Sequence, residues 1–323
     1  MLPHRHSLAA CAVALLAAPV HGQTLADART CERAITGSAV DRVAVQRAMA
    51  ARPVTPVAEF AAGCMSVMGA RWDSAAAQFR RAARGNPRSS AAFLWVGNIT
   101  GQLARIGDAA TKARLAPQVR DAYSTAIALD GTNIDAREGL MQYLIEVPAT
   151  LGGSLTLAGQ QAEAITRLNA FRGLGASLAV ASAGHDNVAV ERLLTQATVQ
   201  FPDSLLGWAN LSAVQADGQR AAAAFATITR WQARGTHRMF ALFSLGRTAA
   251  VTGAQLALGE QALQQYLRGT RGPSDPPVAN AHYRLGQIYE RQKRNAEARA
   301  EYQAALRSNP KMRDAQVSLD RVR

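Results

Sequence analysis

The chain has 323 residues, of which 48% are hydrophobic but only 6% aromatic, and its formal net charge is +13 at neutral pH. Abundant Ala favours helices over sheets, because Ala is the best helix former. A positive charge of this size raises the question of nucleic acid. However, the basic residues are almost all Arg and are scattered, without a long run of like charge or a basic stripe interleaved with aromatic residues. We therefore expect no nucleic-acid partner.

Residues 1–22 are predicted to be a cleavable signal peptide. A basic start around Arg5 precedes an apolar run over residues 8–20, and compact residues up to Gly22 precede the expected cut. The apolar run is shorter than the roughly 20 residues that a membrane-spanning helix needs. We therefore expect an exported, periplasmic protein, with no transmembrane segment after removal of the signal.

Two alternatives would anchor the protein to a membrane. The signal could remain uncleaved, or Cys11 could be lipidated, since the residues before it resemble a lipoprotein cleavage box. Most of the apolar run follows Cys11, which is the wrong order for such a box. Loss of Arg5 with the leader leaves 35 of the 36 basic residues against 23 acidic ones, a charge of +12. That charge fits either a solvated Arg-rich surface or the binding of a polyanion.

The mature chain, residues 23–323, is predicted to consist of consecutive helix pairs. Small residues recur on the first helix of a pair, and Ala and large side chains recur on the second. The expected pairs are a degenerate capping pair at 24–53, then 56–89, 90–133, 134–169, 171–204, 205–238, 239–271 and 279–312, before a capping helix at 313–323.

Two of these pairs contain additional features. The pair 90–133 is longer by about ten residues, which we place between its helices, around 107–116. The pair 134–169 is interrupted at 148–154, where Gly152 and Gly153 would be able to hold an anion near a helix start. No Lys follows these glycines and no strand precedes them, so we interpret the segment as a loop.

The clearest pair is 279–312, where large and small residues fall at fixed offsets. The residues at these offsets are Leu285, Gly286, Tyr289, Ala298, Tyr302, Ala305 and Pro310. The glycine and the alanines leave room for close helix packing, and the proline ends the second helix because it lacks an amide proton. The pattern resembles the tetratricopeptide repeat, with His282 where that family usually has Trp. The resemblance implies an all-α, right-handed α-solenoid of about six to seven stacked helix pairs with capping helices.

The same resemblance bears on Cys31 and Cys64, the two cysteines of the mature chain. They are 33 residues apart, close to one repeat of 34 residues. They would therefore occupy matching places on neighbouring first helices, within reach of a disulfide in an oxidising compartment. The alternative is two buried thiols that act as small apolar residues.

The resemblance also implies that the first helices line a concave groove that binds a peptide or a helix. The residues that this register places in the groove are Asn98, Gln102, Phe240, Phe243, Arg247, Asn280, Tyr283, Arg284 and Gln287. Aromatic residues there would give contact area, while Arg and Asn would fix backbone or carboxylate groups. For each residue, ordinary packing between repeats is the alternative. The carboxylate clamp of cytosolic co-chaperones is not expected, because Phe60 and Cys64 occupy its place in the pair 56–89.

No arrangement of residues predicts catalysis, a cofactor or a metal. The histidines of the mature chain are dispersed, and His185-Asp186 is expected to form a turn and a helix cap. The sequence therefore predicts a periplasmic scaffold that binds a protein or peptide partner, and not an enzyme. The alternatives are polyanion binding by the Arg-rich surface and an enzyme with its site in the inserted loops.

Overall fold

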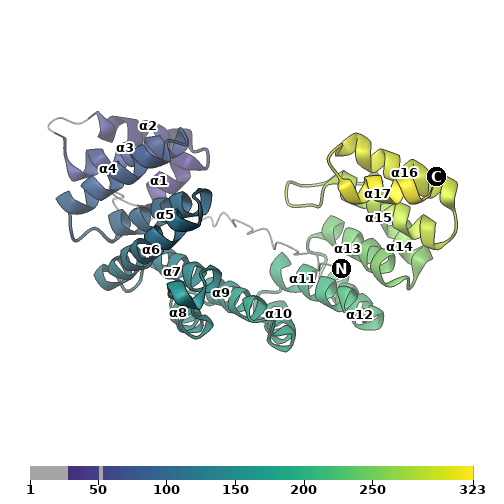
Figure 1. Ribbon diagram of the computed structural model, residues 1–323. Helices are drawn as coiled ribbons and strands as arrows, with labels where there is room; N and C mark the ends of the chain where they lie inside the picture. Colours follow the sequence, from purple (N-terminus) through teal and green to yellow (C-terminus); the bar gives the residue numbers. More distant parts are fainter. Residues whose placement is uncertain (1–27, 51–53, 323) are drawn as a thin grey trace. The chain divides into compact units, whose positions relative to one another are not determined.

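A computed structural model describes residues 28–50 and 54–322, and it divides the chain into two compact units after Gly153. The described residues form α-helices and one short 3₁₀ helix, without a strand, which confirms the all-α fold (Figure 1). The predicted signal peptide and Cys11 lie outside the described residues. Within each unit, successive helices pack against each other in chain order.

The first unit is built from helices that alternate with short turns. They are α1 (Ala28–Ile35), α2 (Ala39–Met49), α3 (Pro56–Met68), α4 (Trp72–Gly85), α5 (Ser90–Ile106), α6 (Ala109–Leu129), α7 (Ile134–Glu146) and the 3₁₀ helix η1 (Ala149–Leu151).

The second unit continues the alternation to the end of the described chain. Its helices are α8 (Leu155–Leu168), α9 (Ala170–Ala183), α10 (Asn187–Gln200), α11 (Leu205–Asp217), α12 (Ala221–Ala233), α13 (Arg238–Thr252), α14 (Leu256–Arg268), α15 (Val278–Arg291), α16 (Asn295–Ser308) and α17 (Arg313–Arg321).

Short polar side chains start most of these helices, because they satisfy amide protons that have no partner within the helix. Asn133, for example, accepts from the Ala136 amide at 2.9 Å at the start of α7. Asn169 closes α8 and also accepts from the Arg172 amide at 2.9 Å, which turns the chain into α9 within one residue. Local capping therefore sets the short connections.

Close packing within the pairs depends on a glycine of the first helix that faces a large side chain of the second. A Cβ atom on Gly286 would lie 2.6 Å from the ring of Tyr302. The same arrangement recurs between Gly63 and Phe79, Gly97 and Tyr123, and Gly246 and Leu263. Each large side chain is buried, so this contact forms the core of its pair.

Two details of the predicted organisation are corrected by the structure. The extra residues of the pair 90–133 do not form a loop around 107–116: only Gly107 and Asp108 separate α5, of 17 residues, from α6, of 21 residues. The Asp108 carboxylate accepts from the Thr111 amide at 2.8 Å and starts a helix in a segment of good helix formers. The insertion therefore lengthens the helices.

The second correction concerns the predicted pair 134–169. Its two helices, α7 and α8, belong to different units, because the division falls after Gly153. Pro148 and the left-handed Gly152, with φ of 94°, end the helical path here. Within the second unit, α8 packs against α9 instead.

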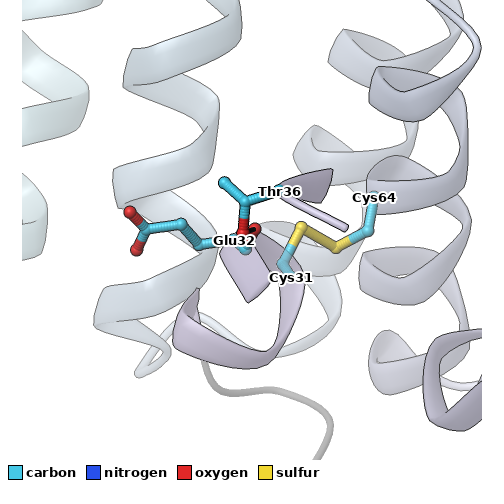
Figure 2. Close-up of a disulfide and its surroundings, with 4 residues drawn as sticks. All are labelled: Cys31, Glu32, Thr36 and Cys64. Carbon is cyan, nitrogen blue, oxygen red and sulfur yellow. Dashed lines mark hydrogen bonds between the residues drawn. A yellow bond between two sulfur atoms is a disulfide. The ribbon is translucent and has the colours of Figure 1, made fainter. Parts of the chain in front are cut away.

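A disulfide joins Cys31 and Cys64, with the Cα atoms 5.6 Å apart (Figure 2). It links α1 to α3, two helices that also pack against each other, and both cysteines are buried. Helix α1 has only 8 residues, too few for a stable isolated helix. The cross-link therefore holds the start of the first unit to its core.

The double substitution Cys31→Ala/Cys64→Ala is expected to lower the free energy of unfolding by about 3 kcal/mol, because a closed loop of this size restricts the unfolded chain. Urea unfolding followed by circular dichroism measures the loss. A reductant should destabilise the wild-type protein to a similar degree and leave the double variant unchanged. Equal stability of the oxidised and reduced wild type would contradict the prediction.

Gly286→Ala is expected to destabilise the protein by about 1–2 kcal/mol, because overpacking against Tyr302 outweighs the better helix propensity of Ala. Gly175 in α9 is the matched control, since a Cβ atom there would meet nothing within 4 Å. Gly175→Ala should raise stability by about 0.5–1 kcal/mol. Urea midpoints that shift in the same direction for both variants would show that close approach at Gly286 is unimportant.

Candidate functional site

Three first helices of the second unit, α11, α13 and α15, lie side by side, because α13 packs against both of the others. They carry most of the residues predicted to line a groove. We use the term α11–α13–α15 face for seven half-buried or exposed residues on these helices, namely Asp217, Phe240, Arg247, Asn280, Tyr283, Arg284 and Gln287.

The first interaction on this face is an ion pair between α13 and α11. Nη2 of Arg247 donates to both carboxylate oxygens of Asp217, at 2.8 Å each. Nη1 of Arg247 is buried and has no hydrogen-bond partner. Only one end of the guanidinium fork is therefore used, and a buried donor without a partner is unfavourable.

The second feature is the guanidinium of Arg284 on α15. Its Nη1 donates to Oε1 of Gln287 at 2.8 Å, and its Cζ lies 5.3 Å from the centre of the Tyr283 ring. Nε2 of Gln287 in turn donates to the Tyr283 hydroxyl at 3.0 Å. These contacts fix the orientation of the Arg284 side chain, but they give it no negative charge.

The electrostatic environment of Arg284 is unfavourable to its own charge. Burial lowers the pKa of Arg284, and the positive charge of Arg247 lowers it further. Asp217 and Asp314 act in the opposite direction, but neither forms an ion pair with Arg284. An Arg side chain does not lose its proton in a folded protein, so this guanidinium keeps its charge. The face therefore holds a cation that lacks a carboxylate partner within the described chain.

The aromatic residues of the predicted groove divide into two kinds. Phe243 is only 8% exposed and packs against Tyr266, with ring centres 5.7 Å apart. Phe240 and Tyr283 are half-buried, so part of each ring is open to contact. Ordinary core packing accounts for Phe243, whereas Phe240, Tyr283 and the half-buried Asn280 remain available on the face.

Asn98 and Gln102 belong to the first unit, on α5, whereas the other predicted groove residues belong to the second unit. Oδ1 of Asn98 accepts from the Tyr123 hydroxyl at 2.9 Å, and the Gln102 amide oxygen accepts from Arg105. The structure thus gives Asn98 a role in holding α6 against α5.

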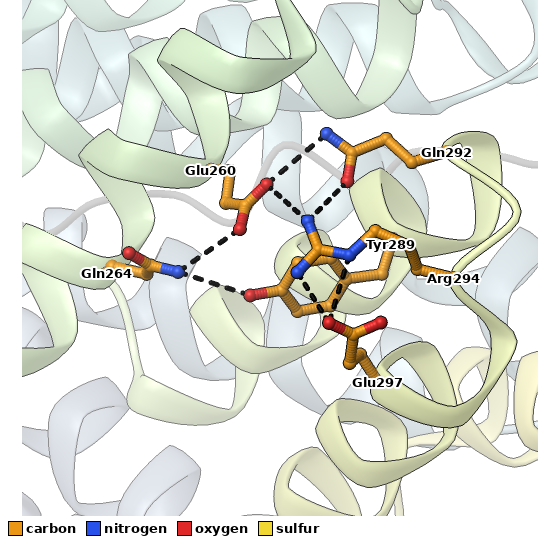
Figure 3. Close-up of polar contacts among 6 residues, drawn as sticks. All are labelled: Glu260, Gln264, Tyr289, Gln292, Arg294 and Glu297. Carbon is orange, nitrogen blue, oxygen red and sulfur yellow. Dashed lines mark hydrogen bonds and ion pairs between the residues drawn. The ribbon is translucent and has the colours of Figure 1, made fainter.

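A second polar cluster lies around the start of α16 (Figure 3). Arg294 reaches Glu260 of α14 at 2.8 Å and Glu297 at 2.6 Å, and its Cζ lies 4.2 Å from the centre of the Tyr289 ring. These two carboxylates raise the pKa of Arg294. Because Arg294 pairs with a carboxylate of α14 and with one of α16, the cluster joins neighbouring helix pairs.

The three histidines among the described residues occupy structural positions. His185 has φ of 56° in the turn before α10, and Asp186 accepts from the Ala189 amide at 2.9 Å, as expected for a turn and a cap. His237 contacts the carbonyl of Asp203 at 2.9 Å, and Nδ1 of His282 lies 2.6 Å from Glu301.

Neither a metal site nor a membrane span is found in the part of the chain that the structure describes. No three His, Cys, Asp or Glu side chains gather there in a way that would hold an ion. The described helices also include none that is both long and apolar enough to cross a bilayer.

Comparison with known proteins gives a family match for the C-terminal part of the chain. Residues 241–313, which span α13 to α16, match the family model described as a tetratricopeptide repeat. No curated protein sequence matches the chain.

Several solved structures are similar to it. A tetratricopeptide-repeat protein from Parabacteroides merdae is 12% identical, with 91% of this chain and 96% of that chain covered and a TM-score of 0.49. PilF of Pseudomonas aeruginosa is 13% identical over 72% of this chain and 97% of that chain, with a TM-score of 0.45. The C-terminal part of a repeat-containing protein from Cytophaga hutchinsonii is 15% identical over 91% and 99%, respectively, with a TM-score of 0.45.

The family match and the recurring packing of a glycine against a large side chain lead to one identification. Residues 241–313 consist of tetratricopeptide repeats, and the other described residues also form consecutive packed helices. This class of helical scaffold binds proteins and peptides.

Phe243→Ala is expected to lower the free energy of unfolding by about 3 kcal/mol, because it removes a buried ring from the core. Tyr283→Phe, which removes only the hydroxyl that accepts from Gln287, should cost less than about 1 kcal/mol. Urea unfolding distinguishes the two. A Phe243→Ala variant as stable as wild type would show that this side chain does not belong to the core.

Proposed function

We propose that the protein is an exported scaffold that binds a protein or peptide partner through the α11–α13–α15 face, without catalysis. The observation that carries the proposal is the combination on one face of half-buried aromatic rings with guanidinium groups whose donors are not all used. Such a mixture suits recognition of a polypeptide, since rings supply contact area and Arg supplies directed hydrogen bonds.

Two observations support export. The sequence of residues 1–22 has the order of a secretory signal. In addition, Cys31 and Cys64 are joined by a buried disulfide, and such bonds persist in oxidising compartments such as the periplasm.

Chemical crosslinking followed by pull-down from envelope extract tests the proposal. The variant Asn280→Ala/Tyr283→Ala changes the face while sparing Phe243, whose loss would disturb the core. We expect a partner that crosslinks to the wild-type protein and is reduced at least roughly tenfold with this variant, as for residues central to an interface.

Arg307→Gln is the matched control, because Arg307 is exposed on α16, which is not part of the face. It should capture the partner as the wild type does. Equal capture by all three proteins, with loss of the captured material at moderate salt, would instead favour charge-driven binding of a polyanion.

A further inference from the structure

The α11–α13–α15 face contains hydrogen-bond donors that lack a partner within the described residues. Nη1 of Arg247 is buried and makes no hydrogen bond. Nε and Nη2 of Arg284 also have no partner among the described residues, since its bond to Gln287 uses Nη1 alone. Arg247 and Arg284 lie on α13 and α15, two helices that pack against each other, and the charge of Arg247 lowers the pKa of Arg284. Their free donors therefore belong to one neighbourhood.

Of the two cations at this site, only Arg247 forms an ion pair with a carboxylate. Asp217 forms an ion pair with Arg247, whereas Arg284 has only the neutral Gln287 and the face of the Tyr283 ring. A half-buried cation without a carboxylate is less favourable than a fully hydrated one, and a second cation beside it adds repulsion. Elsewhere in the unit, Arg294 and Arg321 each have carboxylate partners. The arrangement at Arg284 is therefore suited to a bound anion.

The number and shape of the free donors point to one carboxylate. The planar fork of a guanidinium matches the two oxygens of a carboxylate. One unmatched positive charge balances one carboxylate, whereas a phosphate monoester brings a charge of about −1.5 to −2. A carboxylate therefore fits the site better than a phosphate does.

The location on the helices favours a side chain over a chain end. Arg247 and Arg284 lie in the middle of α13 and α15, and both helices continue past them. Toward the helix starts, the face carries the half-buried Phe240 and Asn280. A bound segment would therefore find helix surface on both sides of the anion.

We propose that Arg284, together with Arg247, binds the side-chain carboxylate of an Asp or Glu within an extended segment of the protein partner. This inference rests on the proposed function and specifies the chemistry of the same face. It differs from recognition of a terminal carboxylate, because the segment runs past the site.

Blocked peptides that differ in one group test the inference with the full mature protein. The probes are Ac-Gly-Phe-Glu-Phe-Gly-NH₂ and its Gln counterpart, each titrated at constant ionic strength while NMR follows the Arg side-chain Nε–H signals. We expect the Glu peptide to bind about tenfold more tightly or better, because a charge-assisted pair is lost with Gln. The shift should include Arg284.

Substitutions then assign the preference to the site. Arg284→Gln should abolish the difference between the two peptides, and Arg307→Gln, with the same loss of charge on α16, should retain it. Arg284→Gln should unfold at the same temperature as the wild type or higher, since it removes an unmatched buried charge. Arg247→Gln, a second variant at the site, should weaken binding of the Glu peptide.

Several results would overturn the inference. Equal affinity for the Glu and Gln peptides, an unchanged preference in Arg284→Gln, or the absence of any Arg284 shift would each do so. Tighter binding of a phosphoserine peptide would make the ligand a phosphate, and tighter binding of the Gln peptide with a free C-terminus would make it a chain end. None of these results decides the proposed function, which depends on partner capture by Asn280→Ala/Tyr283→Ala.

Discussion

The close approach of paired helices at a glycine is the contact on which the rest of the structure depends. At Gly286, the missing side chain lets the Tyr302 ring lie against the backbone of α15, and the same contact recurs at Gly63, Gly97 and Gly246. It fixes the distance between the helices and their rotation about their own axes, because a large side chain fits only one small gap. The contact thus also fixes where the surface residues of each helix pair lie.

The last pair shows how this packing reaches the candidate site. The ring of Tyr302 lies 5.9 Å from the ring of Tyr283, which in turn lies beneath the Arg284 guanidinium. The Tyr302 hydroxyl donates to Glu290 at 2.7 Å, and Glu290 also binds Arg321 of the final helix. The buried Tyr302 ring therefore contacts both the α11–α13–α15 face and the C-terminal helix pair. The orientation of Arg284 thus depends on packing in the core.

The sequence predicts the fold better than the site, for physical reasons. The glycine and tyrosine positions of 279–312 constrain packing directly, so periodicity reveals them. Phe243 is buried, whereas the nearby Phe240 is half-buried. This difference depends on contacts with neighbouring helices, and the sequence pattern of a single helix pair does not reveal those contacts. The sequence did not predict Asp217 as the partner of Arg247. The residue one repeat of 34 residues before Arg247 is Ala213, and Asp217 lies one helical turn further along α11. A search for acidic residues one turn away from the matching position would have found this ion pair.

The net charge of +13 does not by itself describe how the protein would bind a partner. Several Arg side chains are paired with carboxylates, including Arg33 with Asp41 and Arg220 with Glu191, and exposed pairs and free charges are screened by salt. Arg284 differs because it is half-buried without a carboxylate partner among the described residues, and its orientation is fixed by Gln287 and Tyr283. Screening is weaker there, and under the proposed function an anion would have to fit the fixed donors. Selectivity on this face would then arise from the position of one guanidinium more than from the total charge.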